Sequence, residues 1–438
     1  MRFQRAIESQ LLAWKNKSQR KPLLLHGARQ VGKTALMKWF GQTHFADMAY
    51  FNFDEQPALA QLFEQSKAPS QLIGQLALLH GKAIGPQTLL VFDEIQACLP
   101  ALGSLKYFEE NMPQQPLMAA GSLLGVSLAK DHTFPVGKTE FLNLYPLSFD
   151  EFLQQAQPLL HQYVQQLQRI EPLPEIFFNP LKAAFKTYLL CGGLPAVAMA
   201  YLQNSDLAEV DRLLADLVRA YQFDFAKHPV SSDVAKIRYV WDSLPAQLAR
   251  ENKKFVYQLV KTGARAREYE DALVWLQKAG LVYRIGLNET PKLPLAAYDQ
   301  LQAFKLYAFD IGVLRSLSQL PAITLAEGNR FFTEFKGAFL ENYILQSLVP
   351  QFEALPRYWT SGNMAEVDFL VQYQNHILPI EVKAEDNIKG KSLQMYQQKF
   401  DPKLRIRFSM RNLQLQDGLF NIPHFLADHT HQLLGRVL

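Results

Sequence analysis

Apolar positions along the first third of the chain follow two different periods. The short apolar runs PLLLHG (22–27), MAYFNFDE (48–55), TLLVFDE (88–94) and PLMAAGS (116–122) predict buried strands. The longer segments between them repeat apolar residues every three or four positions, as amphipathic helices do. Strands that alternate with helices are typical of a parallel sheet covered by helices. We therefore predict an α/β domain over residues 1–150.

Leucines at helical spacing replace the strand runs in the next part of the chain. The segments EFLQQAQPLLHQYVQQLQ (151–168) and LAEVDRLLADLV (207–218) predict a helical domain over 151–230, which we interpret as a lid. The following segment, 231–320, predicts short helices and then the apolar runs GLVYRIGL (280–287) and KLYAFD (305–310). Helices followed by a β-hairpin favour a winged helix.

The last part of the chain has the order helix and then strands. The helix pattern TEFKGAFLENYILQSL (333–348) precedes two strand patterns, AEVDFLVQY (365–373) and HILPIEVKAE (376–385). This order predicts an α+β domain over 325–438. The stretch PAITLAEGN (321–329) is predicted to be the linker before it.

A glycine loop joins the first predicted strand to the first predicted helix. HGARQVGKTALMKWF (26–40) fits the spacing G-x-x-x-x-G-K-[ST], in which backbone amides and the start of a helix bind phosphates. Lys33 would reach the β and γ phosphates of ATP, and the Thr34 hydroxyl would ligate Mg²⁺. The predicted binding residues are Gly27, Ala28, Arg29, Gln30, Val31, Gly32, Lys33, Thr34 and Ala35.

Two polar strand ends complete this predicted site. In LLVFDEIQ, Asp93 would hold Mg²⁺ through its water shell, and Glu94 would act as general base on the attacking water. Glu94 therefore predicts hydrolysis in addition to binding. Ser122, which ends PLMAAGS, either senses the γ-phosphate or caps the next helix.

The combination of motifs resembles a known family. GARQVGKT, NFDE (52–55), LLVFDEIQ, LNLYPLSFDEFL (142–153), GGLP (192–195) and KLYAFDIGVL (305–314) are similar to the prokaryotic AAA-family ATPases that carry a C-terminal domain of unknown function. The resemblance implies that Leu194 and Pro195 contact the adenine base. Where the family commonly has arginine, this chain has Lys138, so no arginine finger is assigned.

Paired acids on the two C-terminal strands are the second candidate site. A two-residue turn at Gln374 and Asn375 would place Asp368 opposite Glu381 and Glu366 opposite Lys383. Two carboxylates at cross-strand distance can bind a divalent metal while the lysine positions a water, as in a PD-(D/E)xK nuclease core.

The preceding helix adds Glu341, the acid that this nuclease fold usually contributes, so the predicted metal ligands are Glu341, Asp368 and Glu381. The alternative interpretation is structural: Glu366 and Lys383 form a cross-strand ion pair, and the other acids are solvated. Pro379 lacks a backbone donor, which places its strand at a sheet edge or changes the register.

Composition and charge restrict the partners only weakly. The 438 residues are 48% hydrophobic and 20% charged, as in ordinary globular proteins, and the net charge of +4 permits a nucleic-acid partner without requiring one. Lys261, Arg265 and Arg267 would contact DNA phosphates or form a solvated surface. Two cysteines, a charged N-terminus and no long apolar stretch predict a cytoplasmic protein without a membrane span.

Together, the sequence predicts a Mg²⁺-dependent AAA-type ATPase coupled to a C-terminal nuclease-like or nucleic-acid-binding domain. The alternative is an ATP-driven signalling or interaction switch whose terminal domain is catalytically inactive. ATP and ADP are the expected ligands. DNA, a protein partner and a second copy of the chain are left open as partners.

Overall fold

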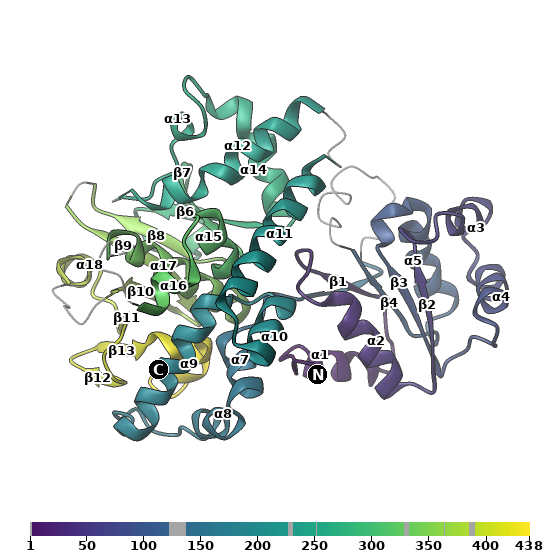
Figure 1. Cartoon of the computed structure of the whole chain (residues 1–438), viewed down its shortest axis with the longest axis horizontal. Helices are drawn as coiled ribbons and strands as arrows, with labels where there is room; N and C mark the ends of the chain where they lie inside the picture. The colour runs from purple at the N-terminus through teal and green to yellow at the C-terminus, as the bar shows by residue number, and fades with distance from the viewer. Residues whose placement is uncertain are drawn as a thin grey trace. The chain divides into compact units, whose positions relative to one another are not determined.

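The computed structural model describes residues 2–121, 137–226, 231–250, 252–327, 333–362, 364–384 and 390–438. Contacts divide the chain into two compact units (Figure 1). The N-terminal unit comprises Gln4–Tyr145 with Lys278–Gly280, and the C-terminal unit contains Pro146–Gln277 and Leu281–Leu438. Among the described residues, no helix has the length and apolar character needed to cross a bilayer.

The N-terminal unit is a parallel sheet with helices on both faces. Its strands lie in the order β2-β3-β4-β1-β5, and all four pairings are parallel, as predicted. The elements are α1 (Glu8–Lys15), β1 (Leu23–His26), α2 (Lys33–His44), β2 (Asp47–Asn52), α3 (Leu59–Gln65), α4 (Pro69–His80), β3 (Thr88–Asp93), η1 (Ile95–Ala97), α5 (Leu99–Asn111), β4 (Leu117–Ala120) and β5 (Glu140–Asn143).

Burial on both faces explains why these strands are continuous apolar runs. All six residues of β3 are buried. Leu90 and Phe92 pack into a cluster with residues of α3, α4 and α5. Alternate strand residues face the other side of the sheet, where α2 contacts β2, β3 and β4. Of the five strands of this sheet, β5 alone was not predicted from the sequence. It lies at one edge of the sheet and is half-exposed along its length.

The C-terminal unit begins with helices, as predicted. They are α7 (Phe149–Ala156), α8 (Pro158–Gln165), α9 (Glu175–Cys191), α10 (Pro195–Asn204), α11 (Leu207–Phe225), α12 (Ser231–Leu248), α13 (Tyr257–Val260) and α14 (Ala266–Lys278). A capping box between Ser148 and Glu151 starts α7, and the Asp206 carboxylate caps α11.

An eight-stranded mixed sheet follows in the same unit, with the order β12-β13-β11-β10-β9-β8-β6-β7. Its elements are β6 (Val282–Asn288), η2 (Leu295–Tyr298), β7 (Asp299–Ala308), α15 (Ile311–Leu317), α16 (Ala322–Glu327), α17 (Thr333–Leu348), η4 (Val349–Gln351), β8 (Arg357–Thr360), β9 (Glu366–Tyr373), β10 (His376–Val382), α18 (Lys391–Phe400), β11 (Arg405–Ser409), β12 (Gln414–Gln416), β13 (Leu419–Pro423), η5 (His424–His429) and α19 (Thr430–Leu434).

This sheet joins two segments that the sequence analysis had assigned to separate domains. The hairpin β6–β7 continues into the C-terminal strands because β6 pairs with β8 at Leu287 and Tyr358. The predicted linker 321–329 is also wrong in part, since α16 occupies Ala322–Glu327. The four-domain division itself stays a prediction.

The hairpin of β9 and β10 has the predicted register but not the predicted position. Tyr373 pairs with His376 and Phe369 with Ile380, which confirms the turn at Gln374 and Asn375. The edge position predicted from Pro379 is wrong, because β10 lies between β9 and β11. The parallel pairing with β11 starts at Ile380, after the proline, so the missing donor is tolerated inside the sheet.

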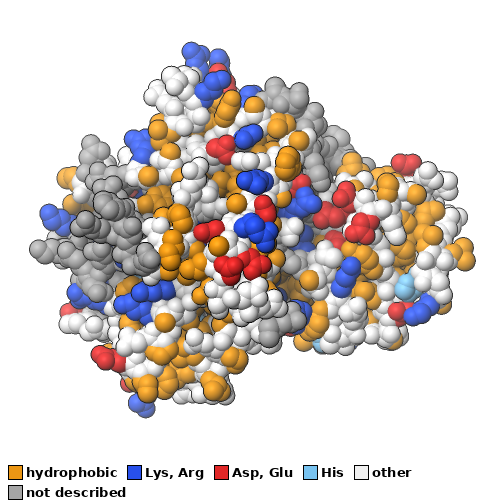
Figure 2. All heavy atoms as spheres, in the orientation of Figure 1, with side chains coloured by type: hydrophobic (Ala, Val, Ile, Leu, Met, Phe, Trp, Pro, Cys, Tyr) orange, Lys and Arg blue, Asp and Glu red, His pale blue; other side chains and the backbone are white. Residues whose placement is uncertain are grey.

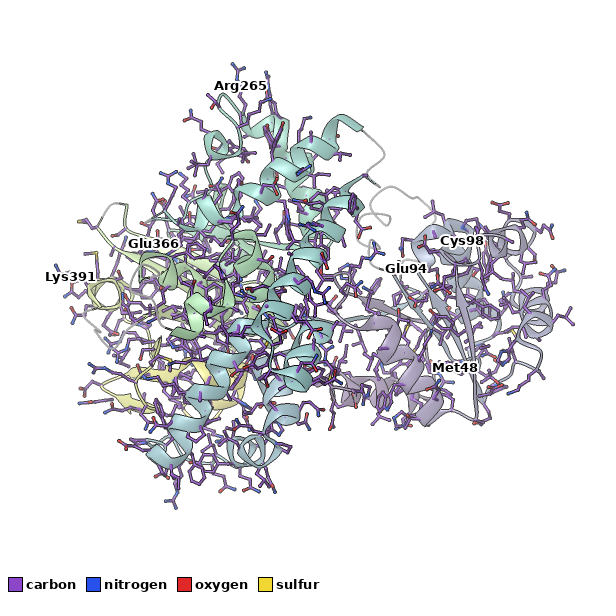
Figure 3. All side chains as sticks on the ribbon, viewed as in Figure 1. Met48, Glu94, Cys98, Arg265, Glu366 and Lys391 are labelled. Atoms are coloured by element: carbon purple, nitrogen blue, oxygen red, sulfur yellow. The ribbon has the colours of Figure 1, made fainter. Side chains whose placement is uncertain are left out.

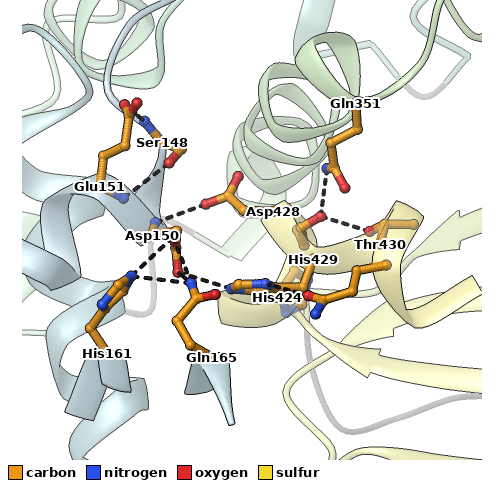
Figure 4. A network of polar contacts seen from close by, with 12 residues as sticks. Ser148, Asp150, Glu151, His161, Gln165, Gln351, His424, Asp428, His429 and Thr430 are labelled. Carbon is orange, nitrogen blue, oxygen red and sulfur yellow. Dashed lines mark hydrogen bonds and ion pairs between the residues drawn. The ribbon is translucent and has the colours of Figure 1, made fainter. Parts of the chain in front are cut away.

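A half-buried polar network connects α7 with η5 near the end of the chain (Figure 4). The Asp150 carboxylate contacts Nε2 of His429 at 2.9 Å and Nε2 of His161 at 3.2 Å, and its backbone N–H donates to Asp428 at 3.0 Å. Burial opposes charge here, but the neighbouring histidines hold the pKa of Asp150 below its usual value. This network fixes η5 against α7 inside the C-terminal unit.

Candidate functional site

The glycine loop connects the carboxyl end of β1 to the start of α2. Figure 3 labels Glu94 just beyond the carboxyl end of β3, at the same edge of the sheet, and Met48 near the amino end of β2. A β-carbon on Gly27 would lie 2.2 Å from the carbonyl oxygen of Leu144, so a side chain there would displace backbone. Gly32 precedes α2 in a left-handed conformation. Ligands of parallel α/β sheets bind at this edge.

The Lys33 side chain is held inside the loop. Its Nζ atom donates to the carbonyl oxygens of Gly27 and Ala28, at 2.8 Å each, and the residue is 6% exposed. Burial lowers the pKa of Lys33 to about 8, although Glu94 and Asp93 favour the charged form. The loop therefore presents a desolvated ammonium that an anionic ligand would stabilise.

Asp93 accepts hydrogen bonds from three residues. Its Oδ2 atom accepts from the Thr34 hydroxyl at 2.6 Å and from the Tyr50 hydroxyl at 2.8 Å, and Oδ1 accepts from the backbone N–H of Glu94 at 3.0 Å. The sequence analysis missed Tyr50, which is the first polar side chain in the apolar run of β2. Burial and the contact with Asp93 raise the pKa of this tyrosine, so it stays a donor.

Glu94 follows Asp93 in a left-handed backbone conformation with φ of 49°. Non-glycine residues adopt this region infrequently, and functional sites are among the places where such strain persists. The side chain of Gln96, another residue that the sequence analysis missed, donates to Glu94 Oε2. This contact holds a half-buried carboxylate beyond the end of β3.

The donor set fits magnesium rather than a transition metal. Within the described part of the chain, no three His, Cys, Asp or Glu residues are arranged to hold a metal ion. A magnesium ion bound with a nucleotide needs only one or two protein oxygens, because waters and phosphates supply the others. The adjacent hydroxyl of Thr34 and carboxylate of Asp93 provide such oxygens.

Comparison with known proteins agrees with this geometry. A family model described as an AAA domain matches residues 19–153. This segment has the fold of an AAA-type P-loop ATPase. Two further models, both domains of unknown function (DUF8612 and DUF4143), match residues 182–324 and 336–425. No curated protein matches the chain.

Several solved structures are similar at low identity. A Walker-type ATPase of Pyrococcus abyssi is 18% identical, with a TM-score of 0.46 and coverage of 72% of this chain and 96% of that one. The ORC2 protein of Aeropyrum pernix, in its ADP form, is 11% identical, with a TM-score of 0.32 and coverage of 73% and 92%. The RuvB Holliday junction branch migration motor of Thermotoga maritima is 14% identical, with a TM-score of 0.29 and coverage of 65% and 89%.

Two further positions of the ATPase domain were discussed from the sequence, Ser122 and Lys138. Ser122 lies outside the described residues. Lys138 forms ion pairs with Glu109 at 2.9 Å and Glu110 at 3.3 Å, which ties the segment before β5 to α5. These contacts give Lys138 a structural role within the domain.

The GGLP motif belongs to the C-terminal unit, where it packs against the start of α15. A β-carbon on Gly192 would lie 2.6 Å from the backbone of Gly312, and the N–H of Gly193 donates to Asp310 Oδ2 at 2.6 Å. Leu194 is fully buried. Close backbone packing thus explains the glycines, and the contact of Leu194 and Pro195 with adenine stays a prediction.

The C-terminal acids have ammonium partners that the sequence analysis did not predict. Nζ of Lys253 contacts Glu341 Oε1 at 2.5 Å, and the Tyr307 hydroxyl donates to Glu341 Oε2 at 3.3 Å. Glu366 pairs with Lys305, whose side chain is fully buried. No short-range pattern marked Lys253 or Lys305, because both lie on other elements.

These pairings correct the predicted cross-strand ion pair. Lys383, which directly follows β10, contacts Glu381 Oε1 at 2.7 Å instead of Glu366. Asp368 Oδ2 accepts from the backbone N–H of Val382 at 2.8 Å. Burial and the nearby Glu341 carboxylate raise the pKa of Asp368 to about 7, despite the opposing lysines Lys253 and Lys305.

The predicted metal ligands of the terminal domain all have partners within the protein. Glu341 contacts the ammonium of Lys253, and Asp368 accepts a hydrogen bond from the backbone N–H of Val382. Glu381 is 3% exposed and forms an ion pair with Lys383. Among the described residues, no three His, Cys, Asp or Glu residues are arranged to hold a metal ion. A metal site at Glu341, Asp368 and Glu381 therefore stays a prediction.

Proposed function

We propose that the chain binds ATP with magnesium and hydrolyses it. The contact between the Thr34 hydroxyl and Asp93 carries this proposal. It brings the glycine loop after β1 and the acidic end of β3 to one place, although β4 lies between the two strands. A phosphate-binding loop beside a carboxylate is the arrangement that phosphoryl transfer to water requires.

Each residue has a separate role in this proposal. The backbone of residues 27–35 and the start of α2 bind the phosphates, and the Lys33 ammonium neutralises them. Bound magnesium would supply further neutralisation of the phosphate charge. Glu94 accepts a proton from water as the water oxygen bonds to the γ-phosphorus. The bond from that phosphorus to the bridging oxygen breaks, and ADP and phosphate leave.

Calorimetry and phosphate release test the proposal. The protein mixed with ATP and magnesium should give a saturable binding heat and release phosphate, and Lys33→Ala should abolish both. If the wild-type protein gave no binding heat, the proposal would be overturned.

The terminal domain is the second part of the proposal. Of the two sequence-based alternatives, we infer that the chain is an ATP-driven switch with a non-catalytic terminal domain. The ion pair of Lys253 with Glu341 supports this inference, because this predicted metal ligand already has a nearly buried ammonium as its partner. DNA incubated with the protein and Mn²⁺ should stay intact. Cleavage that Asp368→Ala removes would restore the nuclease interpretation.

Nucleic acid is a proposed binding partner rather than a substrate. Lys261, Arg265 and Arg267 are exposed between α13 and the start of α14, and Figure 3 labels Arg265 there. On the face drawn in Figure 2, basic side chains are interspersed with acidic ones rather than gathered in a continuous patch. Salt-dependent DNA binding that weakens in Arg265→Ala would support this contact, and unchanged binding would exclude it.

A further inference from the structure

One arginine of the N-terminal segment contacts the glycine loop, which is the proposed phosphate-binding loop. Arg5 precedes α1 and is 6% exposed, although nothing in the local sequence marks it as part of the site. Its Nη1 atom donates to the carbonyl oxygen of Val31 at 2.9 Å, and Nη2 donates to the carbonyl oxygen of Tyr145 at 2.7 Å. The backbone N–H of Arg5 donates to Glu8 Oε1 at 2.8 Å, which fixes the start of this segment.

The contact with Val31 determines the direction of a loop amide. The carbonyl group of Val31 and the N–H group of Gly32 belong to one peptide unit. A trans peptide is planar, so its C=O and N–H point in opposite directions. When the guanidinium of Arg5 holds the carbonyl on one side, the N–H of Gly32 must point to the other. Gly32 is the residue before α2, where amides bind phosphate.

The contact with Tyr145 connects the two ends of the loop. Tyr145 follows Leu144, whose backbone N–H donates to the carbonyl oxygen of His26 at 2.7 Å. Leu144 also lies against Gly27, the first glycine of the loop. Arg5 therefore links the second half of the loop, through Val31, to the segment that packs on its first half.

Arginine is suited to this task. Its planar guanidinium carries several donors in a fixed geometry and stays charged when buried. Two carbonyl oxygens on separate segments can thus be held by one rigid group. Lysine has a single flexible donor centre and would hold them less firmly.

We propose that Arg5 is a positioning residue of the phosphate loop, which aims the Gly32 amide at the phosphates of a bound nucleoside triphosphate. The inference rests on the proposed ATP binding of this loop. Arg5 touches neither nucleotide nor water in this scheme and acts through the backbone. Its loss should therefore weaken phosphate binding more than it changes the chemistry at Glu94.

The chain offers a matched control in Arg20. The Arg20 side chain also donates to two backbone carbonyls of the same unit, those of Lys15 at 2.7 Å and Gln114 at 3.2 Å, but neither lies in the loop. Arg5→Met and Arg20→Met thus each remove a guanidinium that donates to two backbone carbonyls, at different places, although Arg20 is the more exposed of the two. Urea unfolding of each variant gives its stability, so that nucleotide binding is compared between folded proteins.

The experiment measures ATP and ADP affinity by calorimetry with magnesium, and KM and kcat for ATP hydrolysis. Arg5→Met should weaken both nucleotides by about tenfold and raise KM more than it lowers kcat, while Arg20→Met stays within about twofold of the wild type. Arg5→Lys should lie between Arg5→Met and the wild type, and it replaces Arg5→Met in the comparison if that variant does not fold.

Three results would overturn the inference. Arg5→Met could bind nucleotide as tightly as the wild type, both methionine variants could weaken binding equally, or kcat alone could fall. Failure of the underlying function has a different signature, because the wild-type protein itself would then bind no ATP.

Discussion

The hydroxyl of Thr34 donates a hydrogen bond to the carboxylate of Asp93 over 2.6 Å, although 59 positions separate the two residues in the chain. The contact aligns the start of α2 with the end of β3. Around it lie the other polar groups of the site, the Lys33 ammonium, the Tyr50 hydroxyl and the Glu94 carboxylate. Substitution of each of these groups tests one step of the proposed ATP binding or hydrolysis.

Glu94→Gln is expected to separate nucleotide binding from hydrolysis. The amide keeps the size of the side chain but cannot accept a proton from water, so kcat should fall about 100-fold or more. Calorimetry should give an ATP affinity close to that of the wild type, since Glu94 is not placed to bind phosphate. Equal loss of binding and turnover would show that Glu94 supports the loop instead.

Breaking the pair of Lys253 and Glu341 should destabilise the C-terminal unit. The side chains are only 13% and 5% exposed, so Lys253→Met leaves a nearly buried carboxylate without its ammonium and should cost about 3 kcal/mol in the free energy of unfolding. Urea unfolding measures the loss. In the double variant Lys253→Met with Glu341→Gln, the cost should be well below the sum of the single variants. Additive costs would contradict direct pairing.

Two capping aspartates allow a comparison of buried and exposed contacts. Asp310 is fully buried, caps α15 through Val313 N–H at 2.9 Å and accepts from Gly193. Asp206 caps α11 at the surface. Asp206→Ala should cost about 1 kcal/mol of stability, and Asp310→Ala about 2–4 kcal/mol because buried donors lose their acceptor. Similar midpoints in urea for both variants would show that the Gly193 contact contributes little.

The pair of Asp150 and His429 predicts a pH dependence of stability. Neighbouring histidines lower the pKa of Asp150 below 3.8, so its stabilisation is present above that value and is lost as pH falls through the folded pKa. Burial opposes the charge of His429, but Asp150 raises its pKa above 6.5, so its stabilisation is present below 6.5 and is lost as pH rises through the folded pKa. The pair should therefore stabilise most between about pH 4 and 6.5.

His429→Gln tests this window. The urea midpoint of the variant should lie below that of the wild type at both pH values, and the difference should be larger at pH 5 than at pH 8. Two other groups face the pair, His161 at 3.2 Å from Asp150 and Asp428, whose pKa burial raises to about 6, and both remain in the variant. An equal loss at both pH values would assign the contribution of His429 to packing.

Most of the first sheet could be predicted because its strands are buried on both faces. Leu89 to Phe92 form an uninterrupted apolar run in β3, and the glycine loop is defined by spacing within a dozen residues. The half-exposed residues of β5 gave no such run. Likewise, Pro379 suggested an edge only because the sequence does not show that pairing with β11 begins one residue later.

The sequence by itself determined the position of the glycine loop between β1 and α2, the strand that ends in Asp93 and is followed by Glu94, and the register of the β9–β10 hairpin. All three depend on residues close together in the chain, where spacing fixes which side chains are neighbours. Only the tertiary structure decided which ammonium groups contact the C-terminal acids and which arginine contacts the glycine loop. Lys305 reaches Glu366 across 61 positions, and Arg5 reaches Tyr145 across 140. Contacts between residues this far apart depend on how the helices and strands pack together, and the spacing of residues along the chain does not determine that packing.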